Sequence, residues 1–146
     1  MNDLFDVLIV GMGPAGLAAA VELSRLDVHV GVVDDNPEPG GQVYRQISPG
    51  FTITDHGFMG VKHKKGQRLI DDFNAIRNRC TLYNNTYVWG CFNGNSLSLL
   101  RDSKISLIKY KKLLLSEGAM ERHLTFPGWT LPGVMGAGAI QTLVNV

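Results

Sequence analysis

The pattern of apolar residues in the first third of the chain is typical of a parallel sheet covered by helices. Residues 7–10 are four consecutive β-branched or aliphatic residues, as expected for a strand buried on both faces. Apolar residues at 17, 18, 21 and 26 then follow Pro14 at roughly helical spacing, and proline suits the first turn of a helix. Residues 28–33 predict a second strand. Two parallel strands joined by one helix form a right-handed crossover unit.

Further along, the pattern changes from helical to alternating. The apolar positions 69, 70, 73 and 76 predict an amphipathic helix over residues 67–79, and residues 80–83 suit a third parallel strand. Asn93-Gly94 is a strong hairpin signal, and Asp102-Ser103 is a plausible second turn. Segments 86–92, 96–101 and 104–110 therefore predict an antiparallel meander. The sequence thus indicates an α/β fold, a Rossmann-like domain with a parallel sheet plus an antiparallel β-meander.

Composition narrows the function only slightly. The chain has 146 residues, 45% apolar and 18% charged, with a formal charge of +1, which describes an ordinary globular protein. The overall charge gives no argument for nucleic acid or an anionic membrane. The basic run at residues 62–65 is interpreted as a solvated loop leading into a helix rather than as a patch that binds phosphate or a partner. Cys80 and Cys91 have neither disulfide nor metal spacing, so reduced, partly buried thiols and a cytoplasmic protein without a membrane span are expected.

Three glycines lie where the first strand gives way to the first helix. In a dinucleotide-binding turn, Gly11 allows the tight turn, Gly13 lets the backbone approach a pyrophosphate, and Gly16 lets the helix lie close to the strand. The diphosphate then meets the positive end of the helix dipole. An acid at the end of the second strand binds the ribose. Counting from the glycines favours Asp34, whereas counting back from the next glycine pair favours Asp35. We prefer Asp34; a carboxylate here disfavours the 2′-phosphate of NADP.

Several other residues allow two interpretations. Gly40 and Gly41 either free the backbone to run beside a ligand or form a plain turn. Arg45 either neutralises a pyrophosphate charge or forms a surface ion pair. The repeat at residues 136–138 follows no strand and is interpreted as a helix start, and Trp129 either packs its loop or covers the edge of a bound cofactor. The glycines themselves could serve only to pack small residues, without any ligand.

The meander favours FAD over NAD, because an NAD-type sheet would normally continue with another helix and parallel strand. A meander at this crossover resembles the FAD domains of glutathione-reductase-like flavoproteins. We therefore expect FAD as the cofactor. The expected cofactor-binding residues are Gly11, Gly13, Pro14, Ala15, Gly16, Asp34, Asp35, Gly40, Gly41, Gln42, Arg45, Val88 and Gly118.

Four motifs resemble the flavoprotein component of bacterial FAD-dependent amine dehydrogenases, a family that includes opine oxidases, hydrogen cyanide synthases and dye-linked proline dehydrogenases. The motifs occupy residues 11–16, 34–42, 118–122 and 126–134 and span nearly the whole chain. The resemblance implies an oxidoreductase that oxidises a C–N bond of an amino-acid-like amine. It also implies two kinds of partner, a second oxidoreductase subunit together with an iron–sulfur subunit, in a homo- or hetero-oligomer. The catalytic residues and the particular amine cannot be named from these residues.

Two departures from the family qualify this expectation. Ser116-Glu117 replaces the usual Ala-Thr before Gly118, so that a charge lies near an otherwise neutral contact. Family members also continue well past residue 146. Residues 1–125 are therefore interpreted as the ADP-binding half of a truncated FAD domain, and residues 126–146 as a Pro/Gly-rich crossover and the start of a following segment. The alternatives are a non-catalytic fragment that needs a partner chain, and a relative of the NAD(P)H-dependent disulfide reductases. The latter predicts a reactive cysteine pair, which is absent here.

Overall fold

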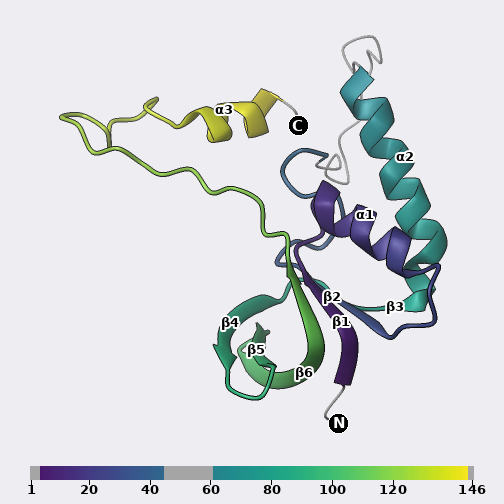
Figure 1. Cartoon of the computed structure of the whole chain (residues 1–146). Helices are drawn as coiled ribbons and strands as arrows, with labels where there is room; N and C mark the ends of the chain where they lie inside the picture. Colours follow the sequence, from purple (N-terminus) through teal and green to yellow (C-terminus); the bar gives the residue numbers. More distant parts are fainter. Residues whose placement is uncertain (1–3, 45–60, 145–146) are drawn as a thin grey trace.

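The chain folds around one mixed sheet of six strands, in the order β3-β2-β1-β6-β5-β4. The computed structural model describes residues 4–44 and 61–144. Neighbouring strands β3, β2, β1 and the end of β6 are parallel, while β6, β5 and β4 are antiparallel (Figure 1). The strands are β1 (Leu4–Val10), β2 (Val30–Val33), β3 (Cys80–Tyr83), β4 (Tyr87–Phe92), β5 (Ser96–Arg101) and β6 (Lys104–Leu115).

Two helices pack on one face of the parallel strands (Figure 1). Helix α1 (Pro14–Leu23) begins directly after the glycine turn, and α2 (Val61–Ile76) packs beside it and ends in a short 3-10 turn (Arg77–Arg79). Leu17 and Phe73 are fully buried in the core between these helices and the sheet. The strand–helix–strand unit predicted from the sequence is therefore present, with both helices covering one face.

The meander supplies a second core on the other side of the molecule. Leu97 and Leu99 of β5 and Ile108 of β6 pack with Phe5 and Leu8 of β1. Strand β6 belongs to both parts of the sheet, because its first half pairs with β5 and its second half pairs with β1. One long strand thus joins the meander to the centre of the parallel sheet.

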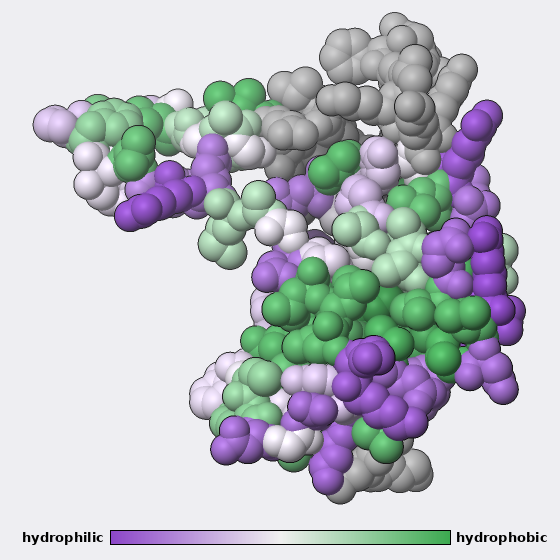
Figure 2. Space-filling model, viewed as in Figure 1, coloured by the Kyte–Doolittle hydropathy of each residue, from purple (hydrophilic) through white to green (hydrophobic). Residues whose placement is uncertain are grey.

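Beyond β6, the chain extends away from the sheet as an arm (residues 117–144) that ends in α3 (Ala137–Val144) (Figure 1). The Glu121 carboxylate accepts a hydrogen bond from the Gly138 backbone N–H (3.1 Å), which satisfies one donor at the start of α3. Figure 2 shows apolar surface in patches along the arm. Its exposed large apolar side chains include Met120, Leu124, Phe126, Leu131 and Leu143.

The predicted fold class, the third parallel strand and the three-stranded meander are confirmed. Four details were wrong. The second strand begins at Val30, β6 continues to Leu115, the basic run at residues 62–65 lies within α2, and Cys91 is exposed. None of the helices in the described part of the chain is long and apolar enough to cross a membrane, as expected. The division at residue 125 remains a prediction.

Candidate dinucleotide-binding site

The turn between β1 and α1 brings three parts of the chain into backbone contact. The Gly11 N–H donates to the Val33 carbonyl (2.8 Å), which ties the turn to the end of β2. Gly11 has a φ of +104°, and a Cβ there would lie 2.4 Å from the Ser116 carbonyl oxygen. A Cβ on Gly16 would lie 1.8 Å from the Gly11 carbonyl oxygen. The packing of the chain itself therefore requires glycine at both positions.

Gly13 is different, because no contact within the described chain requires it. Its φ of −71° suits any residue, and an added Cβ would have no atom within 4 Å. Gly13 is the N-cap residue of α1, and no side chain of residues 4–44 or 61–144 caps this helix end. Open space thus adjoins the positive end of a helix, which is the place where a diphosphate would bind.

The second glycine pair lies against this turn. The Gly40 N–H donates to the Met12 carbonyl (2.9 Å). Gly41 has a φ of +59°, and a Cβ there would lie 2.8 Å from Gly13 Cα. Gly41 is therefore needed for the loop after β2 to approach the glycine turn this closely, whereas Gly40 is needed for the loop itself, because a Cβ there would lie 2.1 Å from the Tyr44 carbonyl oxygen. The structure brings together two motifs that the sequence separates by more than twenty residues.

Asp34 at the end of β2 is buried, and its carboxylate bonds to the chain itself. One oxygen accepts from the Met12 backbone N–H, and the other accepts from the Asn36 backbone N–H (2.8 Å) and side-chain amide (3.0 Å). Its backbone bonds to Tyr83 and Thr86, which flank the loop from β3 to β4. Asp34 therefore shapes the glycine turn and holds the neighbouring strand ends.

Asp35 follows as the exposed carboxylate at the same strand end. Asn36 also donates its side-chain amide to Asp35 Oδ1 (2.7 Å), so that one asparagine bonds to both aspartates. Asn36 thereby orients the acidic pair at the carboxyl end of the sheet, where ligands bind in open α/β folds.

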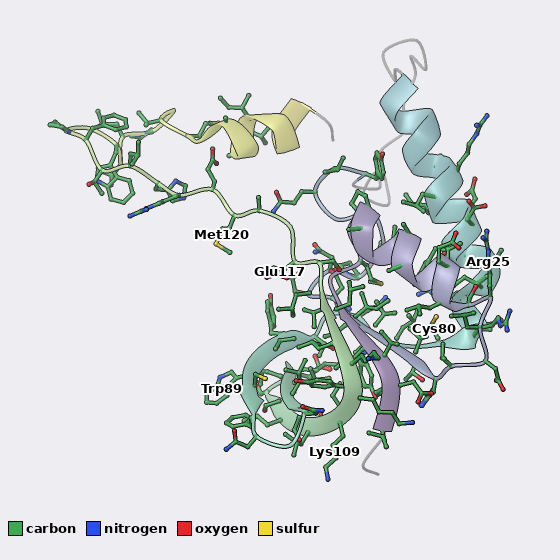
Figure 3. The ribbon with its side chains drawn as sticks, in the orientation of Figure 1. Arg25, Cys80, Trp89, Lys109, Glu117 and Met120 are labelled. Atoms are coloured by element: carbon green, nitrogen blue, oxygen red, sulfur yellow. The ribbon has the colours of Figure 1, made fainter. Side chains whose placement is uncertain are left out.

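Ser116 closes the turn from the other side. Its hydroxyl lies within hydrogen-bonding distance of the Val10 (2.8 Å) and Gly11 (3.0 Å) carbonyls, and its backbone N–H donates to Val10 (2.8 Å). Glu117 is exposed where the arm leaves β6 (Figure 3). Gly118 follows with a φ of +76° and open space around its Cβ position. The substituted serine thus has a structural role in this chain.

The remaining expected contacts are less closely grouped. Pro14 is the first residue of α1 and Ala15 is exposed beside it; Gln42 is exposed in the loop after the second glycine pair. Val88 is 38% exposed in β4, where it pairs with β5 rather than with the strands that carry the glycine turn. Arg45 lies outside the described residues. The ligand contacts assigned to all these residues remain predictions.

Sequence reasoning missed the structural roles of three residues that organise this edge. Ser116 and Asn36 are described above, and Asn84 donates its side-chain amide to the Pro37 carbonyl (2.6 Å). Asn84 Oδ1 is buried without a donor among the described residues. The available signal was position: each residue lies within three positions of the end of a parallel strand, where polar side chains often serve a site.

The described residues form neither a reactive cysteine pair nor a metal site. Cys80 and Cys91 lie on β3 and β4, the opposite edge strands of the sheet, and burial raises the pKa of the Cys80 thiol despite the nearby Arg79 charge. No group of three potential metal ligands occurs among the described side chains. Trp129 lines a pocket within the arm, together with Phe126 and Met135.

These features are typical of the glycine turn of dinucleotide-binding folds, and comparison with known proteins gives the family. The family model for pyridine nucleotide-disulphide oxidoreductases matches residues 5–143. The chain belongs to this family.

Named relatives point to a narrower group. The chain is 36% identical over 149 residues to an opine oxidase subunit from Agrobacterium tumefaciens, in a match that covers 97% of the chain and 29% of that protein. It is 39% identical over 140 residues to the hydrogen cyanide synthase subunit HcnB from Pseudomonas aeruginosa, covering 94% of the chain and 30% of the relative. The structure of L-proline dehydrogenase from P. horikoshii matches with a TM-score of 0.62 and 26% identity, over 84% of this chain and 24% of that one. The chain thus spans less than a third of the length of these relatives.

Proposed function

We propose that this chain is the ADP-binding part of an FAD site in an oxidoreductase that oxidises a C–N bond of an amino-acid-like amine. The observation that carries the proposal is the open space at Gly13. Gly11, Gly16 and Gly41 are glycines because the chain itself leaves no room for a side chain, whereas Gly13 lies at a helix N-terminus beside space that none of the described residues fills. A diphosphate held by the backbone N–H groups of this first turn explains that glycine.

The ribose of the adenosine is assigned to Asp35 rather than to Asp34. Both oxygens of Asp34 already accept hydrogen bonds from Met12 and Asn36, and its side chain is buried. Asp35 is exposed at the same strand end, and a carboxylate there can accept hydrogen bonds from two ribose hydroxyls. In this proposal, Asp34 acts as the internal anchor of the turn, and the ribose contact moves to Asp35, the residue that counting back from Gly40 and Gly41 favours.

FAD, when bound, would accept the two electrons released by oxidation of the amine. The residues of this chain would bind the ADP half of the cofactor, orient it on α1 and place its charge at the helix dipole. The substrate class is inferred from relatives named as opine oxidase and L-proline dehydrogenase, whose names indicate amino-acid-derived amines. The opine oxidase and hydrogen cyanide synthase relatives are named as subunits, which supports separate partner chains, and an electron-accepting iron–sulfur protein is part of the proposal.

A second candidate function is an FAD-binding piece that works only with another polypeptide. It is favoured by the arm, where Met120 is 94% and Leu124 is 78% exposed. Apolar side chains that gather in exposed patches, as they do along the arm in Figure 2, mark surfaces that bind a partner. In this case the chain would bind FAD only after the complementary polypeptide is added.

The test is a titration of the purified chain with FAD, followed by flavin fluorescence, for the parent and for Gly13→Ala. The new methyl group meets no atom of the described residues, so the free energy of unfolding should change by less than about 0.5 kcal/mol. The methyl group should nevertheless obstruct the diphosphate and weaken FAD binding by about tenfold or more. Gly16→Ala is the matched comparison, and it should lower stability by about 3 kcal/mol because its methyl group overlaps a backbone oxygen.

Equal FAD affinity of the parent and Gly13→Ala would refute the proposed diphosphate site. A stable, folded parent that takes up no FAD would favour the second candidate. Once FAD is bound, bleaching of the flavin by an amine such as proline, without NADH, would support the substrate class, whereas bleaching by NADH alone would favour a disulfide-reductase relative.

A further inference from the structure

We propose that the outward face of the meander docks on an anionic lipid surface. Strand register defines this face. Three residues of the central strand β5, namely Ser96, Ser98 and Leu100, alternate along one face of the meander. Their direct partners on the neighbouring strands include Tyr87 and Phe92 of β4 and Ile105, Leu107 and Lys109 of β6. Directly opposed residues in a sheet share one face. We call this surface the outer meander face; it consists of Tyr87, Phe92, Ile105, Leu107 and Lys109.

The core lies behind this surface. The alternate residues Leu97, Leu99 and Ile108 are buried against β1, so the meander curls around its own core and turns the outer meander face to the outside (Figure 1). The inner residues thus account for folding, and the apolar residues on the other side need a different explanation.

The exposed apolar side chains on this surface are large. Tyr87 is 58%, Phe92 51%, Ile105 66% and Leu107 45% exposed. Trp89 lies beside them at a register shift in β4, is 63% exposed and is seen on the outside of the meander in Figure 3. Tyrosine, tryptophan and phenylalanine with aliphatic neighbours are typical of surfaces that enter the interfacial layer of a bilayer.

The charge around this surface is positive, although the whole chain carries only +1. The meander (residues 86–110) holds three basic residues, Arg101, Lys104 and Lys109, and a single acid, Asp102. Asp102 lies 3.7 Å from Arg101 and offsets that charge, and Lys111 is paired with Asp6 (2.6 Å). Lys104 and Lys109 remain as exposed cations beside or on the outer meander face. Lysines at this position attract anionic headgroups.

This composition fits a lipid surface better than the other possible occupants. A second copy of the chain would bring like charges together at the rim, which disfavours self-association. Long lysine side chains suit mobile lipid headgroups, because the ammonium group is a point charge on a flexible stem, unlike the planar guanidinium group of arginine. The aromatic groups and lysines together therefore indicate lipid.

The experiment measures co-sedimentation of the full chain with vesicles made of equal parts phosphatidylglycerol and phosphatidylcholine, and with vesicles of phosphatidylcholine alone. We expect binding to the anionic vesicles that weakens with added salt. Lys109→Glu and Ile105→Glu should each weaken it by about tenfold. In a Trp129→Phe background Trp89 is the only tryptophan, and its emission should shift to the blue on anionic vesicles.

Leu131→Glu is the matched control, because Leu131 is 61% exposed but lies on the arm. Circular dichroism verifies that each variant is folded. The proposal is overturned if the parent does not prefer anionic vesicles, or if Leu131→Glu releases the chain while Ile105→Glu does not. Failure to bind vesicles, together with binding of polyglutamate that Lys109→Glu removes, would instead assign the face to an acidic protein. Neither result depends on FAD binding.

Discussion

At the scale of single residues, the glycine turn is held by side chains that reach it from distant positions. Ser116 lies at the end of β6, and its hydroxyl lies within hydrogen-bonding distance of the carbonyls of Val10 and Gly11. Asp34, at the end of β2, accepts a hydrogen bond from the Met12 backbone N–H. These contacts fix the conformation of the turn before any ligand binds, which lowers the entropic cost of binding.

The Ser116→Ala variant tests this contribution. Loss of the hydroxyl removes a part-buried hydrogen bond between β6 and the turn, so the free energy of unfolding should fall by about 1 kcal/mol. Because the turn becomes less ordered, FAD affinity should also decrease by about threefold to tenfold. Urea denaturation and FAD titration measure the two effects. Ser106→Ala, at an exposed position of the same strand, is the control and should change neither quantity.

At the scale of elements, strand β1 is tied to both of its neighbours by one carboxylate. Asp6 accepts from the His29 backbone N–H ahead of β2 (2.8 Å) and from the Lys111 ammonium on β6 (2.6 Å). The hydrogen bond from Lys111, and then that from His29, hold the pKa of Asp6 below its usual range. This cross-link lies near the amino ends of the parallel strands, away from the glycine turn.

The lowered pKa predicts how stability depends on pH. The folded chain holds the Asp6 proton more weakly than the unfolded chain does, so ionised Asp6 stabilises the fold above its unfolded pKa. This stabilisation is lost as the pH falls through the lower, folded pKa. Asp6→Asn should therefore be less stable than the parent near neutral pH, and the difference should shrink below about pH 4. Denaturation midpoints at several pH values measure it. A pH-independent difference would contradict the prediction, and Asp102→Asn at an exposed turn is the control.

At the scale of the whole molecule, two core clusters on opposite sides of the sheet make the folded body, and the arm contributes little to either. Residues on the arm are absent from both clusters of buried residues in the described chain. Green surface lies between the helices and the meander in Figure 2, and separate patches appear along the arm. The arm is therefore expected to depend on additional polypeptide for burial, in agreement with the longer relatives.

Two substitutions test this division. Phe73→Ala removes a fully buried ring between α2 and the sheet and should lower the free energy of unfolding by about 3–5 kcal/mol. Leu124→Glu on the arm, where the side chain is 78% exposed, should change it by less than about 0.5 kcal/mol. Chemical denaturation followed by circular dichroism compares the two. A large loss of stability in Leu124→Glu would show that the arm is part of the cooperative core.

Much of the fold could be predicted because its signals are local. Residues 7–10, the glycines and Pro14 are adjacent in the chain, and Asn93-Gly94 places a hairpin between two alternating runs. The extension of β6 was missed, because residues 104–110 alternate like a meander strand while the following residues are two lysines and then three leucines. Strand β6 pairs first with β5 and then with β1, so its two halves have different patterns of apolar residues. A sequence analysis that looks for one pattern per strand therefore ends the strand too early.

In the candidate site, too, some features follow from local sequence and others from contacts between distant residues. The sequence by itself determined a strand–glycine–helix turn, an acidic strand end and a following glycine pair, because steric limits on φ and helix geometry act within a few residues. Only the tertiary structure decided which aspartate faces outward and which glycine borders open space. Those answers depend on contacts between residues 22 positions apart, as for Met12 and Asp34, or 106 apart, as for Val10 and Ser116. Such contacts form only when the sheet brings the carboxyl ends of β1, β2 and β6 together, and a linear pattern contains no measure of that distance.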